Sequence, residues 1–217
     1  MFFIWLFLYG AVSFLSRYLS RWTPWATPLG LLISTATLMI WLLAKGKGAS
    51  LGLQRAQSLP WKKRLPFLLL LLPVGYNLLC ANFSFPALLS IFTICLAVIL
   101  EEVVFRGVLL HFLRRKGDLF AIIASTALFA LAHIFNQGGI DWYQILFALA
   151  AGFAFSGLTL VCGSIFPAMD MHLLINLTAG DMNQSYLWLF FVCIAAYLFC
   201  GIHSIILLSK TSSSEKG

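Results

Sequence analysis

Charged side chains, and acidic ones above all, are scarce in this sequence. Only 10% of the residues are charged, with Asp and Glu contributing 7 and Lys and Arg 14. Hydrophobic residues make up 61% of the chain and the mean hydropathy is +0.96. A soluble domain of 217 residues has too little interior to bury so much apolar surface. We therefore expect an integral membrane protein, in which the net charge of +7 does not indicate nucleic-acid binding.

The cysteines and the N-terminus give no sign of a secreted, disulfide-linked protein. All 5 cysteines lie in apolar stretches without CxxC or other ligand spacing, so we interpret them as small hydrophobic residues. The opening MFFIWLFLYGAVSFLS lacks the basic start and the small-residue cleavage site of a signal peptide, which indicates a retained first helix. The cysteines are Cys80, Cys95, Cys162, Cys193 and Cys200.

Long uncharged runs separated by turn residues predict an all-α fold, a polytopic membrane helix bundle. At a rise of about 1.5 Å per residue we expect about eight transmembrane helices in a single domain spanning 1–217. A basic cytoplasmic loop at 45–64 and a polar tail at 210–217 lie outside them. The predicted spans are 2–18, 27–44, 65–81, 86–113, 118–135, 142–161, 165–180 and 185–208.

Lys and Arg collect in alternate loops, which predicts the orientation of the bundle. Cytoplasmic loops carry the positive excess, so both termini are expected in the cytoplasm. The integral membrane protein would lie in the cell membrane if its source is prokaryotic. The basic loop 45–64 is interpreted as an anchor, with an amphipathic segment on the lipid surface as the alternative. The cytoplasmic set is Lys45, Lys47, Arg55, Lys62, Lys63, Arg64, Arg114, Arg115, Lys116, Lys210 and Lys216, against Arg17 and Arg21 outside.

Small residues in the run 142–161 predict close helix packing. Gly152 and Gly157 are flanked by other small side chains, a pattern typical of helices whose backbones approach each other in a membrane. We expect this helix to pack closely against its neighbours rather than to form a cofactor loop.

Ionisable side chains inside the apolar runs are costly in hydrocarbon, so they indicate function. Glu102 and Arg106 stand at i and i+4 on one helix face and suit an ion pair, whereas Glu101 points about 100° away. His172 and Asn176 are also at i and i+4, so they project toward a common point as candidate oxyanion donors. The full set is Glu101, Glu102, Arg106, His133, Asp170, His172 and Asn176.

Depth in the membrane tests whether these groups can meet. Glu101 and His133 each lie about 20 Å from the charges Arg114 and Asp118 that mark the cytoplasmic end. His172 lies only about 8 Å beyond Pro167, where its helix is expected to begin. Either the connection 162–166 dips into the bilayer, or the two spans around it are misplaced.

Three motifs in this region resemble those of a known family. EEVVFRG at 101–107, FALAH at 129–133 and HLLIN at 172–176 are similar to the E-E-x-x-x-R, F-x-x-x-H and H-x-x-x-N motifs of the CPBP intramembrane endopeptidases. That family, also called Abi, includes CAAX prenyl proteases and bacteriocin-processing enzymes. The three motifs occur in order within expected helices, and the resemblance covers a catalytic core of about 86–180.

The resemblance implies a role for each matching residue. Glu101 with His133 would activate a water that attacks a peptide carbonyl, and His172 with Asn176 would stabilise the oxyanion. The family is also described as metal-dependent, and a His₂Glu zinc site from Glu101, His133 and His172 is the alternative. We prefer the metal-free glutamic type without a cofactor, because there is no HExxH helix and Asn is a poor zinc ligand. Glu102, Arg106 and Phe129 would be structural parts of the motifs.

The expected function is hydrolysis of a peptide bond in a membrane-associated protein or peptide at the lipid bilayer. Candidate substrates are a C-terminal sorting segment, a leader peptide and a prenylated CAAX-type C-terminus. Two alternatives from other classes use the same architecture. One is a proton-linked transporter with Glu101, His133 and His172 as a relay, and the other is a non-enzymatic immunity or scaffold protein.

Overall fold

The computed structural model describes residues 23–79, 86–134, 141–180 and 184–214, together with 11, 15, 18 and 19. Within these residues the chain is helical and contains no strand, which confirms the predicted all-α class. Most of the expected first helix, 2–18, lies outside the described residues, as do Cys80, Arg17 and Arg21.

The observed helices follow the predicted spans closely. Their ends differ from the predicted ones by a few residues, because hydropathy locates a span better than it locates the turn that ends it. The long rod 88–116 is one predicted span, interrupted by a π-helical turn. The elements are α2 (Ala26–Ala44), η1 (Ala49–Leu51), α3 (Trp61–Arg64), η2 (Leu65–Leu71), α4 (Leu72–Leu79), α5 (Leu88–Glu102), η3 (Val103–Leu109), α6 (Leu110–Leu113), η4 (Arg114–Lys116), α7 (Asp118–His133), α8 (Trp142–Cys162), α9 (Phe166–Thr178), η5 (Gln184–Tyr186) and α10 (Leu187–Ser214).

The described helices differ in whether they are long enough to cross a bilayer. Four rods are both long and apolar enough: Ala26–Ala44, Leu88–Lys116, Trp142–Cys162 and Gln184–Thr211. Helix α7 is apolar but shorter, and α9 has only 13 residues. Since about 20 residues are needed to span the hydrocarbon core, α9 does not cross it alone. The count of about eight transmembrane helices therefore stays a prediction.

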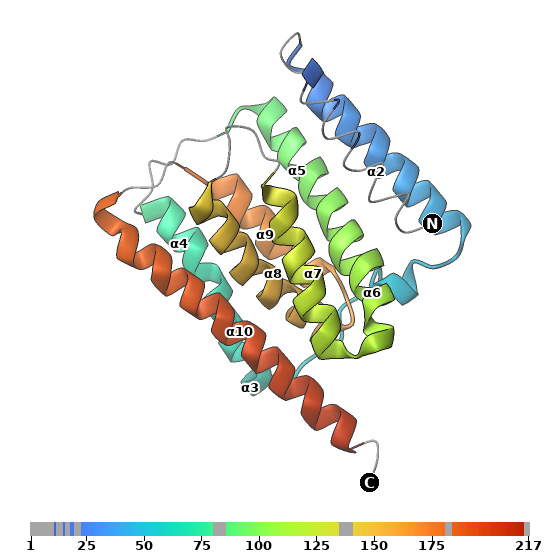
Figure 1. Ribbon diagram of the computed structural model, residues 1–217, viewed down its shortest axis with the longest axis vertical. Helices are drawn as coiled ribbons and strands as arrows, with labels where there is room; N and C mark the ends of the chain where they lie inside the picture. Colours follow the sequence, from blue (N-terminus) through green and yellow to red (C-terminus); the bar gives the residue numbers. More distant parts are fainter. Residues whose placement is uncertain are drawn as a thin grey trace.

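Figure 1 shows α7, α8 and α9 in the middle of the bundle, with α2 and α5 on one side and α4 and α10 on the other. The close packing predicted around α8 is confirmed at two glycines. A Cβ added to Gly152 would lie 3.3 Å from the Cα of Thr126 on α7. A Cβ added to Gly157 would lie 2.6 Å from the Cβ of Ser204 on α10. Helix α8 therefore touches neighbours on both sides through positions that admit no side chain.

Both ends of α8 are fixed by local chemistry. Asp141 caps its first turn, because one carboxylate oxygen accepts hydrogen bonds from the backbone N–H groups of Tyr143 at 2.9 Å and Gln144 at 3.2 Å. At the other end Gly163 adopts φ +62°, the left-handed conformation that favours glycine and ends a helix. The turn predicted around this glycine is confirmed.

The segment 49–57 packs under the connection between α8 and α9. The backbone N–H of Gln57 donates to the Cys162 carbonyl at 2.9 Å, and that of Ile165 donates to the Gly52 carbonyl at 3.1 Å. The Ser164 hydroxyl donates to the Gln54 carbonyl at 2.7 Å. Half of the loop predicted to be a basic anchor is thus a structural element of the bundle.

These contacts place the start of α9 deep in the bundle. A Cβ added to Gly107 would lie 3.3 Å from the Leu51 carbonyl oxygen, so the segment reaches inward from the level of Arg114 to that of Gly107. The two positions are separated by roughly 10 Å of helix rise. From Ile165 the rise to His172 is roughly 10 Å, and from Gly107 back to Glu102 it is roughly 7 Å. Because both spans match their predicted ranges, the connection dips inward, and His172 reaches the level of the acidic pair.

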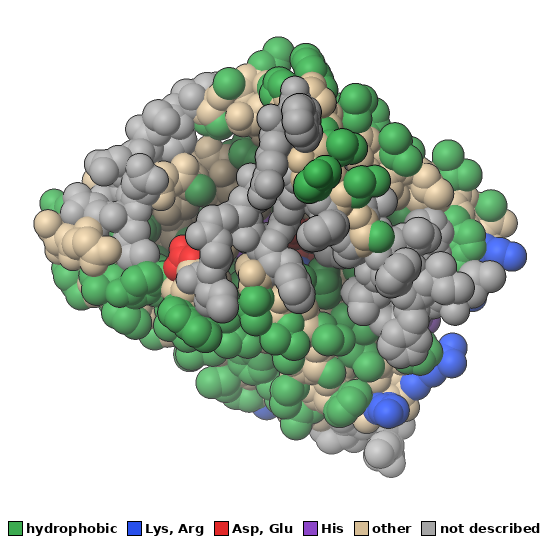
Figure 2. All heavy atoms as spheres, turned by 45° about the horizontal axis from the view of Figure 1, so that its top comes forward, with side chains coloured by type: hydrophobic (Ala, Val, Ile, Leu, Met, Phe, Trp, Pro, Cys, Tyr) green, Lys and Arg blue, Asp and Glu red, His purple; other side chains and the backbone are tan. Residues whose placement is uncertain are grey.

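The outer surface of the bundle is apolar. Large hydrophobic side chains face outward on several helices, among them Leu79 at 85%, Leu88 at 82% and Ile40 at 67% exposure. In Figure 2 hydrophobic side chains cover most of the described part of the face, and Lys and Arg gather along its lower and right-hand edge. This distribution fits an integral membrane protein. Of the four cysteines in the described residues, Cys162, Cys193 and Cys200 are buried.

Candidate active site

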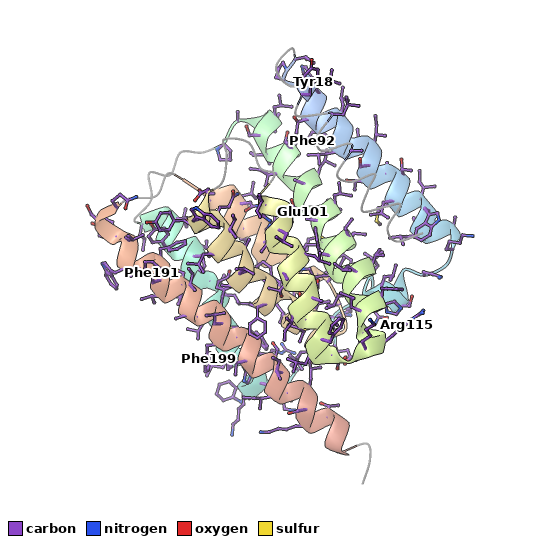
Figure 3. All side chains as sticks on the ribbon, viewed as in Figure 1. Tyr18, Phe92, Glu101, Arg115, Phe191 and Phe199 are labelled. Carbon is purple, nitrogen blue, oxygen red and sulfur yellow. The ribbon has the colours of Figure 1, made fainter. Side chains whose placement is uncertain are left out.

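The acidic pair lies where the α5 rod changes its helical geometry. Glu101 and Glu102 are the last residues of α5, and the π-helical turn η3 begins at Val103. Such turns are rare and concentrate at functional sites, because they shift the direction of the following side chains. The Phe105 carbonyl within this turn accepts a hydrogen bond from the buried Ser125 hydroxyl of α7 at 3.0 Å. Figure 3 labels Glu101 in the middle of the bundle.

The side chain of Glu102 is fully buried and contacts two basic side chains, Arg106 and His172. Its Oε1 lies 3.0 Å from Nη1 of Arg106, which confirms the ion pair predicted from the i, i+4 spacing. The same oxygen lies 2.8 Å from Nδ1 of His172 on α9. A carboxylate in a low-dielectric interior is stable only when opposite charge and hydrogen bonds compensate it, and these two contacts supply both.

His172 stands between the two carboxylates. Its Nδ1 faces Glu102, and its Nε2 lies 3.8 Å from Oε2 of Glu101. The Glu101 side chain is 19% exposed, whereas that of Glu102 is not exposed at all. The adjacent acids therefore occupy different environments: Glu102 is sealed inside the protein, and Glu101 retains access from outside.

The ring of Phe129 connects the three motifs. It lies 4.6 Å from the ring of His133 and 5.9 Å from that of His172, measured between centroids. The Arg106 guanidinium carbon lies 3.9 Å above the same ring. Such a stacked arrangement holds the cation over the negative face of the aromatic ring, so one buried side chain on α7 positions groups from three helices.

The hydrogen bond of His133 determines which of its ring nitrogens carries the proton. Its Nδ1 lies 2.9 Å from the Phe129 carbonyl oxygen, four residues earlier on α7. Because a carbonyl only accepts, Nδ1 carries the hydrogen and donates it. In the tautomer with hydrogen on Nδ1, Nε2 is the acceptor nitrogen. His133 is half-buried.

Asn176 lies one helical turn after His172 and is half-buried. The end of its helix is held by α4: Nδ2 of Asn77 donates to the Ile175 carbonyl at 3.2 Å and to the Thr178 hydroxyl at 3.3 Å. An amide side chain that binds the last carbonyls of a helix fixes where that helix stops. Asn77 was not singled out from the sequence, since an isolated asparagine in an apolar run carries no motif.

Three other polar residues lie away from this cluster. Asp170 is exposed and lines a different cavity with Arg55 and Arg64. His111 is exposed near the basic end of the α5 rod, and Nε2 of His203 lies 3.2 Å from the Lys63 carbonyl oxygen. Neither histidine is among the residues around Glu101.

The residues present were also tested for a metal. Among the described residues, no group of three or more His, Cys, Asp or Glu side chains is arranged to hold a metal ion. His172 already directs Nδ1 to Glu102, and Nδ1 of His133 is engaged by a backbone carbonyl. These Nδ1 contacts leave Nε2 of both histidines available, which is also how zinc-bound histidines are oriented, so the zinc set of Glu101, His133 and His172 stays the alternative.

Comparison with known proteins gives a family for the segment that carries this site. A family model described as type II CAAX prenyl endopeptidase Rce1-like matches residues 83–178. This match supports the resemblance to the CPBP and CAAX protease family that the three motifs predicted. No curated protein and no solved structure matches the chain. The Rce1-like match supports a CAAX-type intramembrane protease in general, with a membrane-associated substrate and a lipid bilayer as its surroundings.

The Rce1-like segment contains all the residues around Glu101 described above except Asn77. It begins just before α5 and ends at the last residue of α9. The contact between Glu102 and His172 was missed by the sequence analysis, which paired Glu102 with Arg106 alone. No signal in the sequence indicates it, because helical spacing relates residues only within one helix.

Proposed function

We propose that this protein is a glutamic intramembrane endopeptidase in which Glu101 and His133 activate water and His172 and Asn176 stabilise the oxyanion. The observation that carries the proposal is the position of His172, 2.8 Å from the sealed Glu102 and 3.8 Å from the accessible Glu101. A distance of 3.8 Å is too long for a direct hydrogen bond. Contacts between catalytic groups are often this long in enzymes without substrate and shorten when substrate binds.

We infer the protonation state of His172 from the charges around it. With both carboxylates ionised and Arg106 as the only cation that the described residues bring to them, the cluster would carry one net negative charge in a low-dielectric site. A proton on His172 cancels that charge. The imidazolium donates from Nδ1 to Glu102 and has a second donor, Nε2–H, on the side of Glu101. That second donor is the one we assign to the oxyanion.

The reaction then proceeds in two steps. The Glu101 carboxylate takes a proton from a water that also donates to Nε2 of His133, and the oxygen of that water forms a bond to the peptide carbonyl carbon. The carbonyl oxygen becomes an oxyanion and accepts hydrogen bonds from His172 and Asn176. When the carbon–nitrogen bond breaks, the amine leaves with the proton held by Glu101, and the carboxylate is restored.

Glu101 lies in the central part of the bundle as viewed in Figure 3, and water and substrate must reach it there. The 19% exposure of the Glu101 side chain provides that access, whereas Glu102 and Arg106 have none. A nucleophilic water can therefore contact the Glu101 carboxylate, which lies at the boundary between solvent-accessible and fully buried groups. This division of roles between adjacent acids is the basis of the proposed mechanism.

The test compares the wild type with Glu101→Gln in proteoliposomes, using farnesylated CAAX peptides and whole-membrane analysis of newly formed protein termini. We expect cleavage products with the wild type and a loss of at least about a thousandfold with the variant. Asp170→Asn is the matched control, because it also removes one acid from the bundle but lies outside the cluster. Identical termini in wild-type and Glu101→Gln membranes would refute the peptidase.

A further inference from the structure

A cavity distinct from the one beside Asp170 lies at the basic end of the bundle. It has a volume of about 530 Å³ and is enclosed by the segment 49–59, the end of the α5 rod, the last turn of α8 and the C-terminal part of α10. Neither Glu101, His133 nor His172 belongs to its lining. The cavity is therefore separate from the candidate active site, although Arg106 contributes to a wall of each.

The ionisable side chains that line this cavity are all basic. Lys63, His111 and Arg114 line it together with Arg106, and no Asp or Glu belongs to its described lining. Two acids outside the lining contact these cations: Asp118 accepts a hydrogen bond from Nε of Arg114 at 2.7 Å, and Glu102 lies 3.0 Å from Nη1 of Arg106. Amide and hydroxyl side chains, Gln54 and Gln57 among them, add further donors. An anion is the ligand that such a set of donors favours.

Two buried side chains in the wall have polar atoms without a partner. Within the described part of the chain these are the hydroxyl of Thr159 and Nε and Nη2 of Arg106, whose Nη1 pairs with Glu102 at 3.0 Å. Thr159 is 5% exposed and Arg106 only 2%. Buried polar groups in native proteins almost always have partners, so donors without one beside a cavity indicate something that occupies it.

Part of the remaining lining is apolar and belongs to membrane-spanning helices. Leu160 and Val161 come from α8, and Leu207 and Leu208 come from α10. Donors for an anion and a path for a hydrocarbon chain thus meet at one place. Basic pockets between transmembrane helices at the headgroup level are the kind of site that holds anionic lipid headgroups.

We propose that this cavity binds a phosphate group, and that its source is the headgroup of an anionic phospholipid. The phosphate lies among Lys63, Arg114 and the donors of the segment 49–57, and an acyl chain follows Leu207 and Leu208 outward. This inference rests on the cavity alone. It holds or fails independently of whether Glu101 hydrolyses peptides.

The experiment titrates the full chain with phosphatidylglycerol, with phosphatidylcholine as the neutral lipid, and counts bound lipids by native mass spectrometry. Lys63→Gln and the double variant Lys63→Gln/Arg114→Gln remove cations from the cavity. The control variants Lys62→Gln and Lys62→Gln/Arg115→Gln remove equal numbers of positive charges from neighbouring residues that do not line the cavity. A cation near a phosphate contributes about a fivefold change in affinity, so we expect losses of about fivefold and thirtyfold for the cavity variants.

The supporting result is saturable binding of phosphatidylglycerol that weakens in the cavity variants and not in the matched pair. Equal losses in both pairs mean that general surface charge attracts the lipid, which overturns the site. No saturable binding by the wild type overturns it as well. Inorganic phosphate is titrated in parallel. If it binds with the same dependence on Lys63 and Arg114 while the lipid does not, the phosphate site stands and the lipid source is refuted.

Discussion

The contacts of Glu102 lead to a prediction that separates charge balance from simple loss of structure. Changing Glu102 to Gln leaves the buried guanidinium of Arg106 without its counter-ion at 3.0 Å. Removing one member of a buried ion pair costs about 3 to 5 kcal/mol of stability. For a chain of this size that lowers the melting temperature by roughly 6 to 20 °C.

The same change should suppress activity for a different reason. In Glu102→Gln the charges of Glu101 and Arg106 already balance, so His172 no longer needs a second proton and loses its Nε2–H donor. Loss of one oxyanion donor costs about a hundredfold to a thousandfold in rate. We therefore expect an enzyme that is both less stable and nearly inactive.

The double variant Glu102→Gln/Arg106→Met provides the decisive comparison. Methionine keeps the apolar contact with Phe129, which the Arg106 guanidinium now makes at 3.9 Å. Replacing a buried ion pair by neutral groups is often neutral for stability, so the melting temperature should return toward that of the wild type. Glu101 again requires a protonated His172, so activity should recover to within about tenfold of the wild type, since an amide replaces the carboxylate at Nδ1.

Thermal unfolding of the purified protein and initial cleavage rates measure both effects. A double variant that melts like the wild type but stays as inactive as Glu102→Gln would refute the charge-balance reasoning. In that case the carboxylate at Nδ1 of His172, and not the net charge of the cluster, is what catalysis requires.

Further predictions concern packing, positioning and metal. Gly157→Ala should destabilise the protein by about 1 to 3 kcal/mol in thermal unfolding, because its Cβ would meet Ser204 at 2.6 Å, whereas Gly75→Ala, which meets nothing within 4 Å, should not. Asn77→Leu removes both hydrogen bonds that hold the end of α9, so Asn176 should shift. We expect a large loss of kcat with only a small decrease in the melting temperature. Treatment with a zinc chelator should leave the cleavage rate unchanged, and a loss that zinc restores would contradict the glutamic mechanism.

The helices were predictable because their signals are local. Uncharged runs locate the spans, and residues such as Gly163, at φ +62°, end them within a turn. The i, i+4 spacing of Glu102 and Arg106 likewise predicts a contact within one helix, which the structure shows at 3.0 Å. In each case the information lies within a few residues of the feature.

The contacts between distant segments were not predictable in this way. His172 binds Glu102 across 70 residues, and Ser164 binds the Gln54 carbonyl across 110. In both cases the sequence already suggests a local role for one partner. Glu102 is expected to pair with Arg106, and Gln54 belongs to the predicted basic loop, so neither residue indicates a distant contact. The π-helical turn after Glu102 is similarly invisible, because Val103–Leu109 has the composition of an ordinary apolar helix.

Helix α9 shows how the distant contacts serve the site. With 13 residues it is too short to span a bilayer, so its depth is not set by matching its own length to the membrane. The segment 49–57 holds its start through Ile165, and Asn77 holds its end through Thr178. A helix fixed at both ends positions His172 and Asn176 relative to α5 far better than a loop would, and hydrolysis requires placement to within about 0.5 Å. The segment 49–57, which the sequence presents as a basic loop, therefore determines the depth at which the histidine meets the acidic pair.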